Sequence, residues 1–117
     1  MTHAAKSVYY FAFYLYLTGI TLIFIPNVFL STLGLPETNE VWIRVVGILA
    51  LAIGFYYHQT AIQNNTAFFK LTVIVRSLVL VAFVLLVLLK LASPILIGIG
   101  LIDFIGAMWT RMALKKN

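Results

Sequence analysis

The sequence contains no cysteine, and charged residues make up only 9% of its 117 residues. Without cysteine, the chain has no disulfide framework, no thiolate nucleophile and no sulfur-ligated metal site. A soluble domain usually carries about 25% charged residues and about 45–50% apolar residues. Here 63% of the residues are hydrophobic and the mean hydropathy is +1.08. Lipid is therefore the expected solvent for most of the surface.

Groupings of residues that could carry out catalysis are also absent from the sequence. His3 and His58 lie far apart in the chain, and the three acidic residues cluster with neither of them. The serines lack a paired base with an orienting acid, and no glycine-rich phosphate loop precedes a helix. We therefore expect a non-enzymatic protein without a metal site or a cofactor. A membrane-embedded enzyme that acts on lipids is the remaining catalytic alternative.

Basic residues outnumber acidic residues by eight to three, which gives a net charge of +5. They lie scattered at the ends of apolar runs and form no patch interleaved with aromatic side chains. Nucleic-acid binding needs a concentrated basic face. We therefore expect no nucleic-acid partner, and membrane lipids are the expected surroundings.

Four apolar segments each approach the roughly 20 residues that a helix needs to cross about 30 Å of hydrocarbon. They are residues 8–30, 41–59, 71–92 and 95–114. Runs this continuous exclude the alternating pattern of a barrel strand, which leaves helices. A signal peptide is the alternative for the first run, but the run is too long and lacks a small-residue cleavage site. The sequence predicts an all-α, integral membrane four-helix bundle that forms a single transmembrane domain over residues 1–117.

The distribution of lysine and arginine predicts how these helices are oriented. Four spans place the N-terminus, the second loop and the C-terminus on one side of the membrane. The basic residues on that side are Lys6, Lys70, Arg111, Lys115 and Lys116. The basic residues on the other side are Arg44 and Lys90. The positive-inside rule therefore places both termini in the cytoplasm.

Arg76 and Asp103 lie within predicted spans, where a charge costs at least about 2.5–3.5 kcal/mol. From helical rise, the two residues lie at similar depths, so we expect an ion pair between the third and fourth spans. The pair has two interpretations. The structural interpretation is that it fixes the register of the two helices. The functional interpretation is that Arg76 anchors an anion or a lipid headgroup, or that Asp103 is a proton-linked carboxylate.

Small and polar residues recur at three- and four-residue intervals, which places them on single helical faces. On the fourth span they are Gly100, Asp103, Gly106, Ala107 and Thr110. On the second they are Arg44, Gly47, Ala50, Gly54 and Tyr57, with His58 beside them, and on the first they are Tyr14, Thr18 and Thr21. These faces are expected to point toward protein, where the glycines permit close helix packing.

A substrate passage would use the same faces. In that alternative, a cytoplasm-facing polar cavity around Arg76 and Asp103 is lined by Tyr14, Thr18, Tyr57, His58 and Thr110. Arg44 is expected at the outer interface, supported by Glu40 four residues earlier.

Several short motifs carry a resemblance to a known class of proteins. They are Pro26, Leu33-Gly34-Leu35-Pro36, the run Trp42 to Gly47, Gly54, Tyr56-Tyr57, Arg76, and the run Ile102 to Thr110. With these motifs the chain resembles a family of small uncharacterised bacterial membrane proteins with four predicted transmembrane helices. The resemblance covers most of the chain, implies a bacterial inner membrane, and brings no established activity with it.

Two functions are consistent with these features. The first is a non-enzymatic inner-membrane protein that acts through helix packing, either as a homo-oligomer or with a larger membrane protein partner. The alternative is a transporter or a module that binds lipids or amphiphiles in the predicted cavity.

Overall fold

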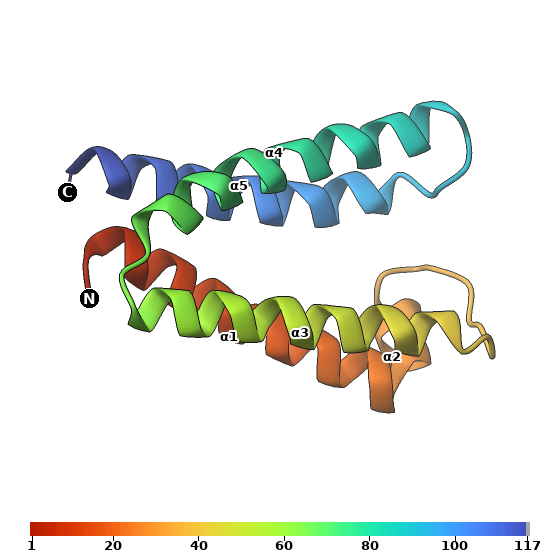
Figure 1. Cartoon of the computed structure of the whole chain (residues 1–117). Coiled ribbons are helices and arrows are strands. Elements are labelled where there is room, and N and C mark those ends of the chain that lie inside the picture. The colour runs from red at the N-terminus through yellow and green to blue at the C-terminus, as the bar shows by residue number, and fades with distance from the viewer. Residues whose placement is uncertain (117) are drawn as a thin grey trace. The chain divides into compact units, whose positions relative to one another are not determined.

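The computed structural model describes residues 1–116, and these residues form five helices and no strand. The helices are α1 (His3–Phe24), α2 (Pro26–Thr32), α3 (Trp42–Ile62), α4 (Thr66–Leu88) and α5 (Ile95–Lys116) (Figure 1). Four of them, α1, α3, α4 and α5, are long and apolar enough to cross a membrane. The predicted all-α class with four long apolar helices is therefore confirmed.

The first predicted span is divided into two helices in the structure. α1 begins at His3, because the Thr2 hydroxyl accepts a 3.1 Å hydrogen bond from the Ala5 amide and caps the helix. It ends at Phe24, because Pro26 restricts the backbone of Ile25, which takes φ −135° and ψ 56°. Pro26 then opens α2, at a position where its missing N–H costs nothing.

α4 begins at Thr66, five residues before the predicted start at residue 71. The side chain of Asn65 accepts a 3.0 Å hydrogen bond from the Phe68 amide, so Asn65 is the N-cap. α5 begins at Ile95, as predicted, directly after Pro94. At α1 and α4, a polar capping residue thus sets the start of the helix more closely than the apolar run does.

Three helices end in the same way, with a residue of positive φ just beyond the helix. These residues are Gly34 (74°), Asn64 (52°) and Lys90 (62°). After α4, the Leu91 amide donates to the Leu86 carbonyl over 2.9 Å. α2 and α3 end with the same kind of hydrogen bond, from an amide to the carbonyl five residues earlier. This pattern is the Schellman motif, which usually employs glycine. Lys90 therefore holds a conformation that is unfavourable for a residue with a Cβ atom.

Internal contacts divide the chain into two compact units. Unit 1 contains Met1–Val8 and Thr60–Asn117, and unit 2 contains Tyr9–Gln59. The predicted four-helix bundle and single domain depend on how the units are placed together, so both stay predictions.

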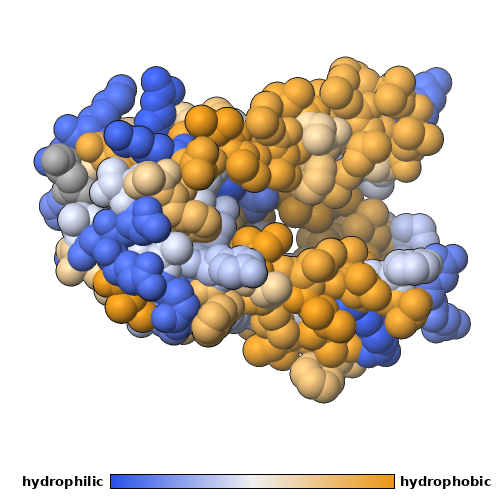
Figure 2. Space-filling view, viewed as in Figure 1, coloured by the Kyte–Doolittle hydropathy of each residue, from blue (hydrophilic) through white to orange (hydrophobic). Residues whose placement is uncertain are grey.

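In unit 1, α4 and α5 form an antiparallel hairpin (Figure 1). Gly100 of α5 lies against α4, where an added Cβ would come within 3.0 Å of the Phe83 ring and 3.1 Å of the Leu80 side chain. Hydrophobic surface covers the part of the hairpin near its loop, and hydrophilic side chains lie toward the ends of the chain (Figure 2). The hairpin is therefore apolar along most of its length.

In unit 2, the backbones of α1 and α3 approach each other closely at two glycines. An added Cβ on Gly47 would lie 2.8 Å from the Gly19 carbonyl oxygen, and one on Gly19 would lie 2.7 Å from the Gly47 carbonyl oxygen. Distances this short leave no room for any side chain at either position. Glycine is therefore what lets these two apolar helices touch along their backbones.

Candidate functional site

A buried group of polar side chains in unit 1 joins three helices. The group consists of Ser7 of α1, Thr72 and Arg76 of α4, and Thr110 of α5, and we call it the Arg76 cluster. The exposed fractions of these four residues are 1%, 4%, 2% and 0%. A polar group buried to this extent is costly unless it is hydrogen-bonded. The hydrogen bonds among these four side chains therefore decide whether their burial is stable.

Threonine oxygens receive the hydrogen bonds of the Arg76 guanidinium. Its Nη2 atom donates to the Thr72 hydroxyl over 2.9 Å and to the Thr110 hydroxyl over 3.0 Å. Its Nε atom donates to the Thr72 carbonyl over 3.3 Å. Because Thr72 lies four residues before Arg76, its hydrogen bonds hold the arginine against its own helix. The hydrogen bond to Thr110 links the arginine to α5.

The hydroxyl of Thr110 connects the arginine to α1. It lies 2.7 Å from the Ser7 hydroxyl, whose oxygen is also 2.7 Å from the Ala4 carbonyl oxygen. The Thr110 hydroxyl oxygen is likewise 3.1 Å from the Gly106 carbonyl oxygen. Each hydroxyl has one hydrogen. Either Ser7 donates to Thr110 while Thr110 donates to its own helix, or Thr110 donates to Ser7 while Ser7 donates to its own helix.

Asp103 lies seven residues before Thr110, on the same face of α5, and is half-buried. The hydrogen bonds of the Arg76 guanidinium described above are accepted by threonine oxygens and not by Asp103. The direct ion pair between Arg76 and Asp103 therefore stays a prediction.

The chemistry that the Arg76 cluster offers is the binding of an anionic group. A guanidinium stays protonated and offers a planar set of donors suited to anionic groups. In residues 1–116, no group of three or more histidine, aspartate or glutamate side chains is placed to hold a metal ion. Within unit 1 the cluster links α1, α4 and α5 and carries one positive charge.

In unit 2, three aromatic rings surround His58. The Tyr16 hydroxyl lies 3.1 Å from His58 Nδ1, and the donor depends on the histidine tautomer. The rings of Tyr9, Phe13 and Tyr16 have centroids 5.4, 5.6 and 5.9 Å from that of His58. This group packs the imidazole among aromatic rings in unit 2.

The residues predicted to line a cavity are divided between the two units. Thr110 belongs to unit 1, while Tyr14, Thr18, Tyr57 and His58 belong to unit 2. Within unit 2, the Tyr57 ring lies 5.8 Å from the Phe11 ring, and Thr18 is half-buried. A shared cavity would require residues of both units, so it stays a prediction.

Arg44 lies near one end of α3 and caps the neighbouring helix. Its guanidinium donates to the carbonyl of Ile23, one of the last residues of α1. Carbonyls at a helix end have no partner within the helix, and a cation there is favourable. Glu40 is exposed and precedes the start of α3 at Trp42, so it is not one helical turn before Arg44 within a single helix. The outer-interface role of both residues stays a prediction.

The remaining small residues contact elements of their own unit. Gly54 faces α1, where an added Cβ would lie 3.1 Å from the Tyr16 ring, and Ala50 is half-buried. Gly106 contributes the carbonyl that accepts from Thr110.

Three residues of these two groups were not predicted from the sequence, namely Ser7, Thr72 and Tyr16. Thr72 had a usable signal, because a threonine four residues before an intramembrane arginine lies on the same helical face. Ser7 lay just outside the predicted first span, so its partner across 103 residues had no signal in the sequence. Tyr16 stood among many aromatic residues that an interfacial belt would explain equally well.

Comparison of the chain with protein-family models, curated proteins and solved structures gave no match. The resemblance to small four-span bacterial membrane proteins therefore stays a prediction.

Proposed function

We propose that this chain is a multi-pass protein of a bacterial inner membrane, with α1, α3, α4 and α5 crossing the bilayer and both termini in the cytoplasm. The supporting observation is the position of basic residues along the α4–α5 hairpin. Lys70, Arg111 and Lys115 line one groove at one end, while Lys90 follows α4 at the loop end. A topology test fuses the C-terminus to green fluorescent protein or to alkaline phosphatase. Fluorescence without phosphatase activity is expected, and the reverse result would refute this orientation.

The proposed function is non-enzymatic and acts through helix packing, with a second copy of the chain or with a larger membrane protein. One observation carries this proposal. α4 presents a row of exposed aliphatic residues at alternating three- and four-residue intervals, which we call the α4 seam. The α4 seam consists of Leu71, Ile74, Leu78, Val81, Leu85 and Leu88, each 53–70% exposed.

The spacing of the α4 seam is that of the contact line in left-handed helix pairs. Transmembrane helices cross mostly in this left-handed geometry. Lipid covers an apolar helix as readily as protein does, so exposure alone does not favour association. Beyond its exposure, the regular row of six residues offers side chains that can interlock with those of a second helix. α4 is also the least buried of the four long helices. These features together favour a helix partner.

Photo-crosslinking in intact membranes tests this proposal. We place benzoylphenylalanine at Leu78 in the middle of the α4 seam, or at Leu49 on α3 as the matched control. Both are leucines within long helices, 60% and 57% exposed. The Leu78 variant is expected to give a discrete adduct, near twice the 13.1 kDa chain mass if the partner is a second copy. Only lipid adducts from Leu78, or the same protein adduct from both positions, would contradict packing along the α4 seam.

A second candidate function is the binding or transport of an anionic amphiphile near Arg76 and Asp103. It is favoured by the burial of a permanent positive charge, because Arg76 is only 2% exposed. Extraction of the purified protein, followed by mass spectrometry, tests for a retained amphiphile. Its loss from a folded Arg76→Lys variant would support this candidate, because lysine lacks the planar fork of donors. Equal amounts in the two proteins, or none in either, would contradict it.

A further inference from the structure

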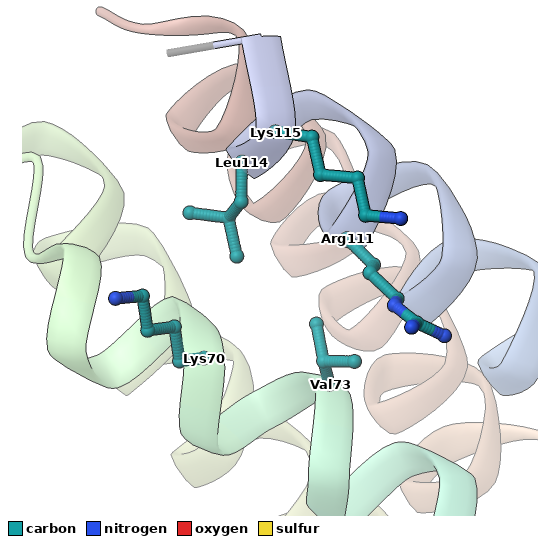
Figure 3. Close-up of a pocket in the computed structure, with 5 residues that line it drawn as sticks. All are labelled: Lys70, Val73, Arg111, Leu114 and Lys115. Carbon is teal, nitrogen blue, oxygen red and sulfur yellow. The ribbon is translucent and has the colours of Figure 1, made fainter.

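A groove of about 300 Å³ lies between the start of α4 and the end of α5 in unit 1. Lys70 and Val73 of α4 line one wall, and Arg111, Leu114 and Lys115 of α5 line the other (Figure 3). Three of the five lining residues are cationic and none is acidic. This arrangement, which we call the basic groove, is separate from the Arg76 cluster and from the α4 seam.

The side chains of the basic groove combine charge with apolar surface. In Figure 3, Val73 and Leu114 lie between Lys70 on one side and Arg111 and Lys115 on the other. The charged ends of Arg111 and Lys115 extend to one side of the groove and that of Lys70 to the other (Figure 3), and an anion in the groove would be attracted by all three charges. The two aliphatic side chains offer hydrocarbon beside the same place. A ligand that suits this groove carries a negative headgroup attached to a hydrocarbon chain.

Orientation of the protein by the positive-inside rule does not account for the shape of the groove. That rule concerns the number of basic residues on one side of the membrane. Lys6 and Lys116 meet it equally well, yet neither lines the basic groove. The presence of three cationic residues from two helices around one groove is therefore an additional feature.

We infer that the basic groove binds the phosphate headgroup of an anionic phospholipid from the cytoplasmic leaflet. Basic pockets between transmembrane helices on the cytoplasmic side are known to hold such headgroups. Lys70, Arg111 and Lys115 donate to the phosphate oxygens, and the first acyl carbons lie against Val73 and Leu114. This inference rests on the membrane placement proposed above and does not depend on helix association along the α4 seam.

Native mass spectrometry of the full chain in a mild detergent tests the inference. The protein is titrated with dioleoyl phosphatidylglycerol, which is anionic, or with dioleoyl phosphatidylcholine, which has the same acyl chains and no net charge. Preferential binding of phosphatidylglycerol is expected. Removing one basic contact weakens attraction to an anionic headgroup about fivefold, so Lys70→Gln with Lys115→Gln should weaken it about 25-fold. Binding of phosphatidylcholine should not change.

The matched control is the double variant Lys90→Gln with Lys116→Gln, which removes the same charge from exposed positions outside the basic groove. Its affinity for phosphatidylglycerol should change less than about twofold. An equal loss in both double variants would show general attraction to positive charge and overturn the site. Equal binding of the two lipids, or displacement of phosphatidylglycerol by millimolar inorganic phosphate, would overturn the choice of ligand. Lipid binding is scored on the monomer mass, so its failure is distinct from failure of the crosslinking test.

Discussion

Replacing Thr110 by valine tests whether the Arg76 cluster holds unit 1 together. Valine has nearly the shape of threonine but no hydroxyl, so the substitution removes hydrogen bonds with little change in packing volume. Thr110 is fully buried and contacts the Arg76 guanidinium and the Ser7 hydroxyl. Both contacts are lost together.

The expected cost follows from those two contacts. A hydrogen bond to a charged group contributes about 1.5–3 kcal/mol. A neutral hydrogen bond between helices in a membrane protein contributes about 0.6 kcal/mol on average. Thr72 continues to accept from the same guanidinium nitrogen over 2.9 Å, so the loss should lie toward the lower end of the sum. We expect Thr110→Val to lower the free energy of unfolding by about 2 kcal/mol.

Unfolding in mixed micelles by sodium dodecyl sulfate, followed by far-ultraviolet circular dichroism, measures this loss. Thr32→Val is the matched control, because the Thr32 hydroxyl is exposed and bonds only to the carbonyl four residues earlier. The control should change stability by less than about 0.5 kcal/mol. If Thr110→Val costs no more than Thr32→Val, the cluster does not stabilise the helices and the reasoning fails.

Three further substitutions, one of them with a matched control, test other parts of the fold by the same unfolding measurement. Gly47→Ala should destabilise the protein by about 1–3 kcal/mol, because its Cβ would lie 2.8 Å from a backbone oxygen of α1. The control Gly98→Ala has no neighbouring atom nearer than 3.9 Å and should stabilise the protein by about 0.5–1 kcal/mol. Equal effects of the two substitutions would contradict the close approach of α1 and α3. Lys90→Gly should stabilise by about 0.5–1 kcal/mol because it relieves the positive φ, and a loss of stability would contradict that strain. Arg44→Met should destabilise by about 0.5–1 kcal/mol because the Ile23 carbonyl loses its cationic partner, and an unchanged midpoint would show that this cap contributes nothing.

Composition predicted the long helices well because the signal is strong and local. A run of about 20 apolar residues can satisfy its backbone in lipid only as a helix, so the number of long helices followed from length and hydropathy alone. The ends were less certain, since they depend on single side chains. Thr2 and Asn65 start helices earlier than the apolar runs suggest, and Pro26 divides one run into two helices.

The candidate sites were harder to predict because they depend on pairs of residues far apart in the chain. The unusual residue, Arg76, stood out from the sequence because a charge within an apolar run is expensive. Of its two threonine partners, Thr110 was expected on the polar face of the fourth span, but Thr72 was missed, because threonine is tolerated in a membrane helix whether or not it has a partner. The basic groove was also invisible, since Lys70 and Arg111 are 41 positions apart and meet only because α4 and α5 form a hairpin.

α4 carries residues of three of these features, and two of the three lie on opposite faces. Successive helical residues are about 100° apart, which places Thr72 and Arg76 on one face and Leu71, Leu78 and the rest of the α4 seam on the other. Of the two groove residues of α4, Val73 falls between Arg76 and the α4 seam, whereas Lys70 lies on the same side of the helix as the seam. Residues that share no partner usually contribute to stability additively. Substitutions at Thr72 and along the α4 seam should therefore affect unfolding and crosslinking separately, because the two sets of side chains lie on opposite faces of the helix.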